Sequence, residues 1–189
     1  MKEGPRWRTR AAPVLDIVIR SPLWTDRRGI RTVLRRAIGE AALATASGGE
    51  LAIVLADDAA VRTLNRDWRR KDQPTNVLSF PAAPKRKQSC FDSGAASKAE
   101  KHAPRVPNAH HCLGDIIIAY ETAAREARAE QKPLRHHIAH LAVHGFLHLV
   151  GYDHQADAQA ETMEALEIAV LARIGVPNPY LRMLPTAAI

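Results

Sequence analysis

The stretch HGFLHLVGYDH, residues 144–154, carries three histidines and two glycines within eleven residues. His144 and His148 are four residues apart in a strongly helical segment, so their side chains project from one face of the helix on successive turns. Gly151 can adopt the backbone conformation that ends a helix, which lets the chain turn and bring His154 back toward the same point. The stretch therefore predicts a helix and a turn that make three imidazoles converge.

Three imidazoles are a donor set that suits zinc, at nitrogen-to-metal distances of about 2.0–2.1 Å, and they leave a fourth coordination position for water. Such an open site indicates catalysis, because the metal lowers the pKa of the bound water toward about 7. We therefore expect one Zn²⁺ ion on His144, His148 and His154, with His144 belonging also to the catalytic centre. The spacing matches the protease signature of the metzincins, but Gly145 replaces the glutamate that serves them as general base. Peptide hydrolysis is the weaker interpretation for that reason.

The same helix carries a longer stripe of histidines, spaced four apart at positions 136, 140, 144 and 148. For His140, a role in supporting the metal ligands or in packing is favoured over metal ligation. The remaining histidines are expected to be solvated: His102, His110, His111, His136 and His137.

The composition is that of an ordinary soluble globular protein, with 46% hydrophobic and 25% charged residues in a chain of 189. No apolar run approaches the roughly 18 residues that suggest a membrane span, and the first residues lack the apolar core of a secretory signal. We therefore expect a cytoplasmic protein with no membrane partner, an organelle transit peptide being the weaker alternative. Cys90 and Cys112 lie in a polar, irregular stretch, so a structural disulfide is not expected.

The chain is basic. Twenty-seven Lys and Arg residues against twenty Asp and Glu residues give a formal net charge of +7. A charge of this size attracts polyanions over long range, which makes RNA or DNA a reasonable partner. Charge alone leaves open the alternative that it serves only solubility.

Hydrophobic periodicity predicts strands that alternate with helices, in the order strand, helix, strand, helix, strand, strand and then three helices. The expected strands are residues 14–20, 51–56, 76–81 and 113–120, and the last three helices are residues 120–131, 134–150 and 157–174. This order predicts an α/β fold with a small mixed sheet of about four strands packed with about five helices.

We expect a single catalytic domain at residues 13–180, preceded by a basic arm at residues 1–12 and followed by a tail at residues 181–189. Inside this domain, residues 82–112 have almost no apolar periodicity and contain six basic and two acidic residues. This segment predicts a long, mobile, basic loop.

A second motif, LNRDWRRKDQPTNVLSFP at residues 64–81, supplies basic side chains between a helix and a strand. Arg69, Arg70 and Lys71 lie at that junction, where cationic groups can hold a charged substrate near the metal. Hydrolysis of a phosphodiester therefore fits this sequence better than hydrolysis of a peptide.

These two motifs, together with LGDIIIA at residues 113–119, resemble the YbeY family of bacterial endoribonucleases, which cut single-stranded RNA in ribosomal RNA maturation and ribosome quality control. The resemblance runs from about Leu51 to Tyr180 and includes ETMEALE and NPY near the C-terminus. Three separated motifs in the right order make it specific. Its main gap is the segment 82–112, which is longer than expected for the family.

The resemblance implies an α/β fold, a zinc ion on His144, His148 and His154, and an arginine, Arg69, that contacts the RNA phosphate or stabilises transition-state charge. It also implies maturation of the 3′ end of small-subunit (16S) ribosomal RNA. The implied partners are ribosomal RNA and the small ribosomal subunit, with ribosomal or assembly proteins as further candidates. Asn76 stands where many members of the family have aspartate, and both residues are accepted there.

Several other side chains keep two interpretations. Trp68 could stack on a base, but a tryptophan on the apolar face of a helix is more often part of the core. Lys71 could contact phosphate or solvent, and Asp153 could orient a ligand histidine or cap the turn. Ser79 and Asp115 lie near strand ends that could border a cleft or fix local hydrogen bonds. The glutamates of the last helix are expected to form a solvated face, with pairing of one of them to a basic partner as the alternative: Glu161, Glu164 and Glu167.

Two other functions stay open. The first is a ribosome-assembly or ribosome-binding factor whose zinc is structural, and the second is a metallopeptidase that recruits its base from elsewhere. Structural zinc usually has four protein ligands, so the number of protein ligands distinguishes the first alternative from a catalytic site.

Overall fold

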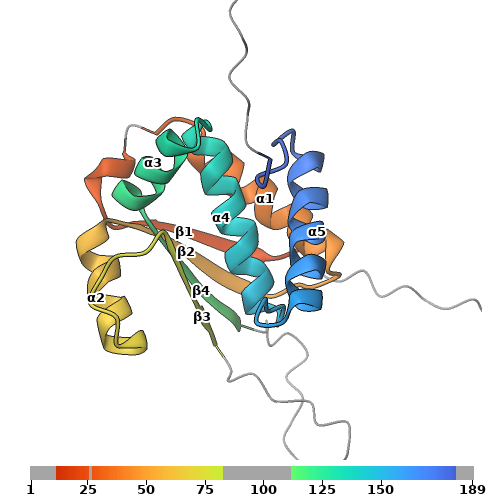
Figure 1. Ribbon diagram of the computed structural model, residues 1–189, viewed down its shortest axis with the longest axis horizontal. Coiled ribbons are helices and arrows are strands. Elements are labelled where there is room, and N and C mark those ends of the chain that lie inside the picture. Colours follow the sequence, from red (N-terminus) through yellow and green to blue (C-terminus); the bar gives the residue numbers. More distant parts are fainter. Residues whose placement is uncertain (1–11, 26, 83–111, 182–189) are drawn as a thin grey trace, which may run out of the picture.

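The structure, a computed structural model, describes residues 12–25, 27–82 and 112–181 (Figure 1). Its elements in chain order are β1 (Val14–Ile19), a 3-10 turn (Pro22–Trp24), α1 (Ile30–Ala44), β2 (Glu50–Ala56), α2 (Asp58–Arg69), β3 (Val77–Pro81), β4 (Cys112–Ala119), α3 (Tyr120–Ala129), α4 (Leu134–Leu149) and α5 (Asp157–Arg173). The predicted order of strands and helices is confirmed. The four predicted strands and the last three predicted helices agree with these bounds to within two residues at each end.

The four strands form one mixed sheet in the order β1-β2-β4-β3. β1 and β2 are parallel, as are β2 and β4, whereas β3 runs antiparallel to β4. Parallel neighbours need a crossover connection, and α1 provides it between β1 and β2. The predicted α/β class with a small mixed sheet is confirmed, and β3 forms one edge of that sheet.

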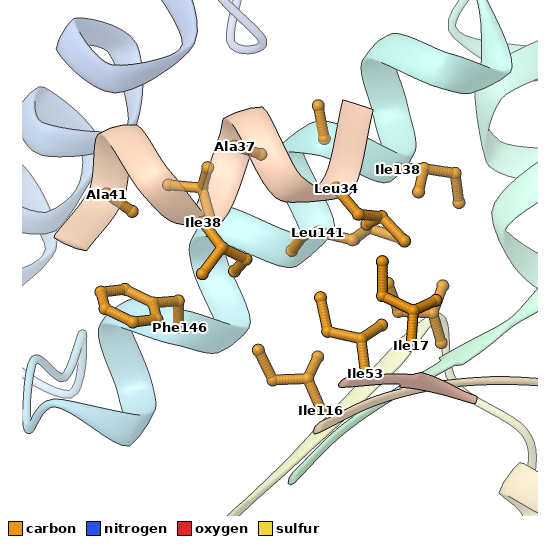
Figure 2. Close-up of a cluster of buried hydrophobic side chains, with 14 of the residues drawn as sticks. Ile17, Leu34, Ala37, Ile38, Ala41, Ile53, Ile116, Ile138, Leu141 and Phe146 are labelled. Atoms are coloured by element: carbon orange, nitrogen blue, oxygen red, sulfur yellow. The ribbon is translucent and has the colours of Figure 1, made fainter. Parts of the chain in front are cut away.

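One face of the sheet carries the main hydrophobic core. Ile17, Ile53 and Ile116 lie at matching positions across β1, β2 and β4 and point toward α1 and α4 (Figure 2). Leu34 of α1 and Phe146 of α4 are fully buried in the same cluster. Each helix buries one face of its 3.6-residue period and each strand one face of its two-residue period. The helix that carries the histidine stripe, α4, is therefore held firmly on the sheet.

The opposite face of the sheet is covered by α2, which lies on the side of β3 away from α4 and α5 (Figure 1). Val61 of α2 packs there with Leu78 and Ile117. Trp68, expected to lie in the core, is 72% exposed, and its ring contacts Phe80 of the edge strand at 5.9 Å between ring centroids. That expectation was wrong because the last turn of α2 extends past the packed part of the sheet, and all four of its residues are exposed.

Gly145 lies where α4 packs closely on the sheet. A Cβ atom at this position would be 2.9 Å from Cγ2 of Ile116 and 3.1 Å from Oγ of Ser79. Ile116 is fully buried on an inner strand and is β-branched, so it has little freedom to move. Position 145 therefore faces β3 and β4, and a glutamate at this position would be pressed against the sheet.

A comparison of two glycine substitutions tests this close approach. Gly39 of α1 has no neighbouring atom within 4 Å of an added Cβ, so Gly39→Ala is a matched control for Gly145→Ala. Both changes improve helix propensity by about 0.8–1.0 kcal/mol. We expect the Gly145→Ala protein to have a free energy of unfolding about 1–3 kcal/mol below that of Gly39→Ala, because only position 145 is overpacked. Urea unfolding measures both values, and equal stabilities would contradict the close packing.

Parts of the predicted organisation lie outside the described residues. These are most of the basic arm and of the tail, and residues 83–111 of the predicted loop. Cys90, His102, His110 and His111 lie there too. Cys112, at the start of β4, is exposed and has a free thiol. None of the helices in the described ranges combines the length and the apolar character that a bilayer crossing needs.

Candidate metal centre

The turn after α4 brings the chain back toward the helix. Gly151 has a φ of 101°, in the left-handed region that suits glycine. The amide of Tyr152 donates to the carbonyl of Leu147 at 2.9 Å, and the amide of Gly151 donates to the carbonyl of His148 at 3.2 Å. These two hydrogen bonds form a Schellman motif, which satisfies the last carbonyl groups of a helix. The helix end predicted at Gly151 is confirmed, and His154 follows three residues later.

The three predicted metal ligands converge. His144, His148 and His154 each offer one ring nitrogen, and these three atoms lie within 4.8 Å of one another. Nε2 of His148 is 3.1 Å from Nε2 of His144. Ligands arranged tetrahedrally at about 2.0–2.1 Å from zinc are about 3.3 Å apart, so this pair can share one ion with little adjustment. Within the described ranges, no other three His, Cys, Asp or Glu side chains come together in this way.

Hydrogen bonds determine which nitrogen of each helix histidine faces the centre. Nδ1 of His144 is 2.9 Å from Oε1 of Glu167, and Nδ1 of His148 is 3.1 Å from the carbonyl oxygen of Tyr152. Both partners are acceptors, so each Nδ1 carries the proton, and in the neutral ring the lone pair lies on Nε2. Two such lone pairs facing each other at 3.1 Å repel unless a cation lies between them. The residues present therefore fit a divalent metal ion.

The environment of His148 favours the form that binds metal. Burial lowers the pKa of His148 to about 4, and the neighbouring His144 and His154 act in the same direction. The bond to the Tyr152 carbonyl and the charge of Asp153 oppose this shift without cancelling it. His148 is therefore neutral at physiological pH, and neutral imidazole is the form that coordinates a metal.

The buried Glu167 is the hydrogen-bond partner of His144 on the side of the ring that faces away from His148. The side chain of Glu167 is 1% exposed, and its Oε2 lies 2.9 Å from Nε2 of His140 and accepts a hydrogen bond from the hydroxyl of Tyr180. Burial raises the pKa of this carboxyl group, but the hydrogen bonds from His140, His144 and Tyr180 outweigh burial and hold the pKa at about 2. Glu167 is therefore an ionised acceptor that fixes the orientation of His144, as carboxylates do behind metal-binding histidines.

The expectation that Glu167 belongs to a solvated face was wrong, whereas Glu161 and Glu164 are exposed as expected. Glu167 lies four residues after Met163 and three before Val170, and both of these are buried. A signal was therefore present in the sequence, because a single carboxylate occupies the apolar stripe of α5. An acid at such a position requires a buried partner, and the histidine stripe of α4 supplies it.

Substitution of Glu167 tests its supporting role. Glu167→Gln keeps the shape of the side chain and removes its charge. We expect the affinity for zinc to fall about 10- to 100-fold, the cost typical of losing a group that orients a ligand. Competition with a chelating dye measures this affinity. Glu161→Gln, at an exposed position of the same helix, is the control and should leave it unchanged. If Glu167→Gln also leaves it unchanged, His144 is held without help from the carboxylate.

A cavity of about 320 Å³ lies beside His144 and His154. Asn76 and Val77, at the start of β3, line one side of it, and residues of α5 line another. The Asn76 side chain is held in place, since its Nδ2 donates to Oε2 of Glu126 at 2.9 Å and its Oδ1 accepts from the amide of Val77 at 2.7 Å. Two of the three converging histidines thus border a space that a substrate group can enter.

The other predicted site residues lie around this centre. Arg69 and Lys71 are exposed, at the end of α2 and just after it, on the sheet face opposite α4, and neither lines the cavity. Oδ1 of Asp153 accepts from the amide of His154 at 2.9 Å, which favours the turn-capping interpretation. His140 is not one of the converging ligands and supports them through the shared carboxylate, the role that was favoured for it.

His137 is 6% exposed, so the expectation that it is solvated was wrong. Its Nε2 is 2.9 Å from Oε2 of Glu126, the carboxylate that also holds Asn76. This position of α4 faces α3 instead of solvent, and the pair His137–Glu126 forms a polar contact between the two helices. His136, the preceding residue, is partly exposed.

A family model and two relatives similar to this chain share one description. Residues 23–175, from before α1 to the end of α5, match the family described as Endoribonuclease YbeY. The chain is 48% identical over 171 residues to a protein of that name from Bradyrhizobium sp. strain BTAi1, and this match covers 89% of this chain and 92% of the relative. It is 49% identical over 174 residues to a protein of the same name from Rhodopseudomonas palustris strain BisB5, and this match covers 90% of this chain and 83% of the relative. A solution structure of TM1509 from Thermotoga maritima is similar over 93% of this chain and 100% of that one, with 18% identity and a TM-score of 0.45, too weak a likeness to bear on function.

Proposed function

The chain belongs to the YbeY family of endoribonucleases, and from this premise we propose that it is a zinc-dependent endoribonuclease that cuts single-stranded segments of ribosomal RNA. Its proposed tasks are maturation of the 3′ end of small-subunit ribosomal RNA and ribosome quality control, in the cytoplasm and in association with the small ribosomal subunit. The net charge of +7 supports a polyanionic substrate.

The convergence of three imidazoles beside a cavity carries this proposal. A zinc ion held by His144, His148 and His154 would supply a Lewis acid that polarises a phosphodiester oxygen or a water molecule. Glu167 and the carbonyl of Tyr152 orient two of the ligands, so their nitrogens need little rearrangement when the ion binds. The cavity bordered by His144 and His154 gives a nucleotide access to the same point.

Arg69 is the residue that we propose for contact with the RNA phosphate. Its guanidinium is exposed and forms no ion pair with any carboxylate of the described residues, so it remains available for a ligand. Guanidinium groups bind phosphate oxygens in a bidentate manner and can neutralise charge that develops in the transition state.

Two alternatives have less support. A ribosome-assembly factor with structural zinc would normally have four protein ligands, but three converge within the described part of the chain, and one of them, His154, is exposed. A metallopeptidase of the metzincin kind needs a general base beside the first histidine, and Gly145 faces the sheet instead.

The test is a set of substrates offered to the full-length zinc-loaded protein. It contains a single-stranded RNA that spans the 3′ end of a small-subunit precursor, the same RNA annealed to its complement, and a peptide library. We expect cleavage of the single-stranded RNA alone, loss of this cleavage on chelation and recovery when zinc is returned. Intact RNA in the presence of bound zinc would favour the assembly factor, and cleaved peptides with intact RNA would favour the peptidase.

A further inference from the structure

The end of α2 carries an exposed aromatic ring beside three cations. This surface, the α2 patch, consists of Trp68, Arg69, Arg70, Lys71 and Phe80. The indole of Trp68 is 72% exposed, and Phe80 contacts it with the ring planes 67° apart. One aromatic neighbour therefore holds the indole in place and leaves most of its surface open to a flat ligand.

Hydrogen bonds connect the turn that carries the cations to α2. Arg62 donates two hydrogen bonds to Asp72, from Nε to Oδ1 and from Nη2 to Oδ2, each of 2.8 Å. The buried side chain of Asn65 donates to the carbonyl of Gln73 at 2.8 Å, and the amide of Lys71 donates to the carbonyl of Asn65 at 3.2 Å. These contacts hold the backbone of the turn in one shape, so the residues that carry its cations have a defined position beside Trp68.

The cations of the α2 patch lack acidic partners. In the described part of the chain, Arg69, Arg70 and Lys71 form no ion pair and no side-chain hydrogen bond, whereas two arginines earlier in α2 are each paired with an aspartate. These cations are available for a ligand and surround an exposed aromatic ring. Together they suit a ligand that carries both negative charges and flat aromatic groups. Proteins bind single-stranded nucleic acids by this combination, with bases stacked on aromatic rings and phosphates held by Arg and Lys.

The ends of α2 and α4, which carry the α2 patch and two of the converging histidines, lie on opposite sides of the same edge strand, β3 (Figure 1). Phe80 contacts Trp68 on the α2 side, whereas the preceding residue, Ser79, faces α4 and approaches Gly145, the neighbour of His144. Successive residues of a strand point to opposite faces of the sheet. An RNA strand that passes around β3 would therefore contact both sites.

We propose that the α2 patch is a binding subsite for single-stranded RNA, in which one base stacks on Trp68 while Arg70 and Lys71 hold the adjoining phosphates. This inference rests on the proposed function and extends it, because it assigns the preference for single strands to a particular surface. A base inside a duplex is covered on both faces by its neighbours and cannot stack on the indole.

Binding is measured separately from cleavage, on the full-length zinc-loaded protein, by fluorescence anisotropy. The probe is a single-stranded oligonucleotide whose 2′-O-methyl and phosphorothioate groups resist cleavage. Trp68→Ala is expected to weaken its binding about 5- to 100-fold, the loss of one stacked base, while Trp68→Phe keeps most of the affinity. Leu43→Ala, which truncates a 70% exposed residue of α1, should change nothing. Because Trp68 is exposed, thermal unfolding of Trp68→Ala should match that of the wild type.

A charge variant tests the phosphate contacts. Arg70→Asn combined with Lys71→Gln removes two charges, and asparagine tolerates the φ of 58° at position 70. The slope of log Kd against log salt should fall by about 1.4, since each phosphate contact on a single strand contributes about 0.7. Arg35→Gln combined with Arg36→Gln removes the same number of charges from exposed positions of α1 and should keep the slope.

The outcomes separate this inference from the proposed function. If both α2-patch variants bind the single-stranded probe like the wild type, the inference is overturned, whether or not the wild type cleaves RNA. If Trp68→Ala weakens duplex and single-stranded probes equally, stacking of a base is excluded. Binding that depends on Trp68 in a protein that cleaves no RNA would support the subsite and overturn the proposed function.

Discussion

Replacing His148 by alanine is expected to abolish both zinc retention and RNA cleavage while the protein stays folded. His148 supplies one of the three converging nitrogens, and His144 and His154 alone leave half of a tetrahedral site to solvent. Loss of a group that merely orients a ligand costs about 10- to 100-fold in metal affinity, so loss of a ligand should cost more. The neighbouring Phe146 and Leu147 are fully buried and keep α4 on the sheet.

Elemental analysis of the purified variant and an assay on single-stranded RNA should show that zinc and activity disappear together. Circular dichroism and the unfolding midpoint should stay close to those of the wild type. His136→Ala, at a partly exposed position of the same helix, is the matched control and should keep both properties. Full cleavage by a His148→Ala protein that holds no zinc would refute a metal-dependent reaction.

Replacing Arg69 by alanine is expected to lower the rate of RNA cleavage by about 100-fold or more and to leave the zinc content unchanged. The expected loss is that of one charge-assisted phosphate contact that positions the RNA, since misplacing a substrate by a change far from the chemistry can cost about 100-fold. Arg69 lies on the opposite sheet face from α4 and contacts none of the metal ligands in the described structure, so its removal should not disturb the centre. Arg69→Lys should restore only part of the rate, because an ammonium group cannot bind phosphate in a bidentate manner.

Single-turnover cleavage and zinc analysis on the same samples measure the two effects. Arg128→Ala removes the same charge from an exposed position in the last turn of α3 and is the control that should keep the wild-type rate. If Arg69→Ala loses zinc and activity to the same degree, Arg69 holds the fold together and does not act on the substrate.

The elements and the convergence of the three histidines could be predicted because each depends on short-range pattern. The spacing of His144 and His148 places two imidazoles on one helix face wherever that helix packs. Gly151 ends the helix through hydrogen bonds within six residues of chain, and this brings His154 to the same point. The order of strands and helices follows from apolar periods of two and 3.6 residues, which are properties of each segment alone.

Burial of individual side chains could not be predicted in the same way. Glu167 lies both in a regular glutamate stripe and in the apolar stripe of α5, and only its contact with α4, which provides two histidines as partners, decides that it is buried. Trp68 continues the apolar stripe of α2 but projects beyond the sheet that the stripe packs on. In both cases the outcome depends on a neighbour from a different part of the chain.

The sequence by itself determined the fold class, the order of elements and the three imidazoles that converge after α4, since local backbone geometry places them. Only the tertiary structure decided that Gly145 faces the sheet, that Glu167 anchors His144, and that Trp68 stands exposed across β3 from the histidines. The physical reason is that burial and pairing arise from contacts between distant segments. No spacing along one segment specifies which surface will cover it.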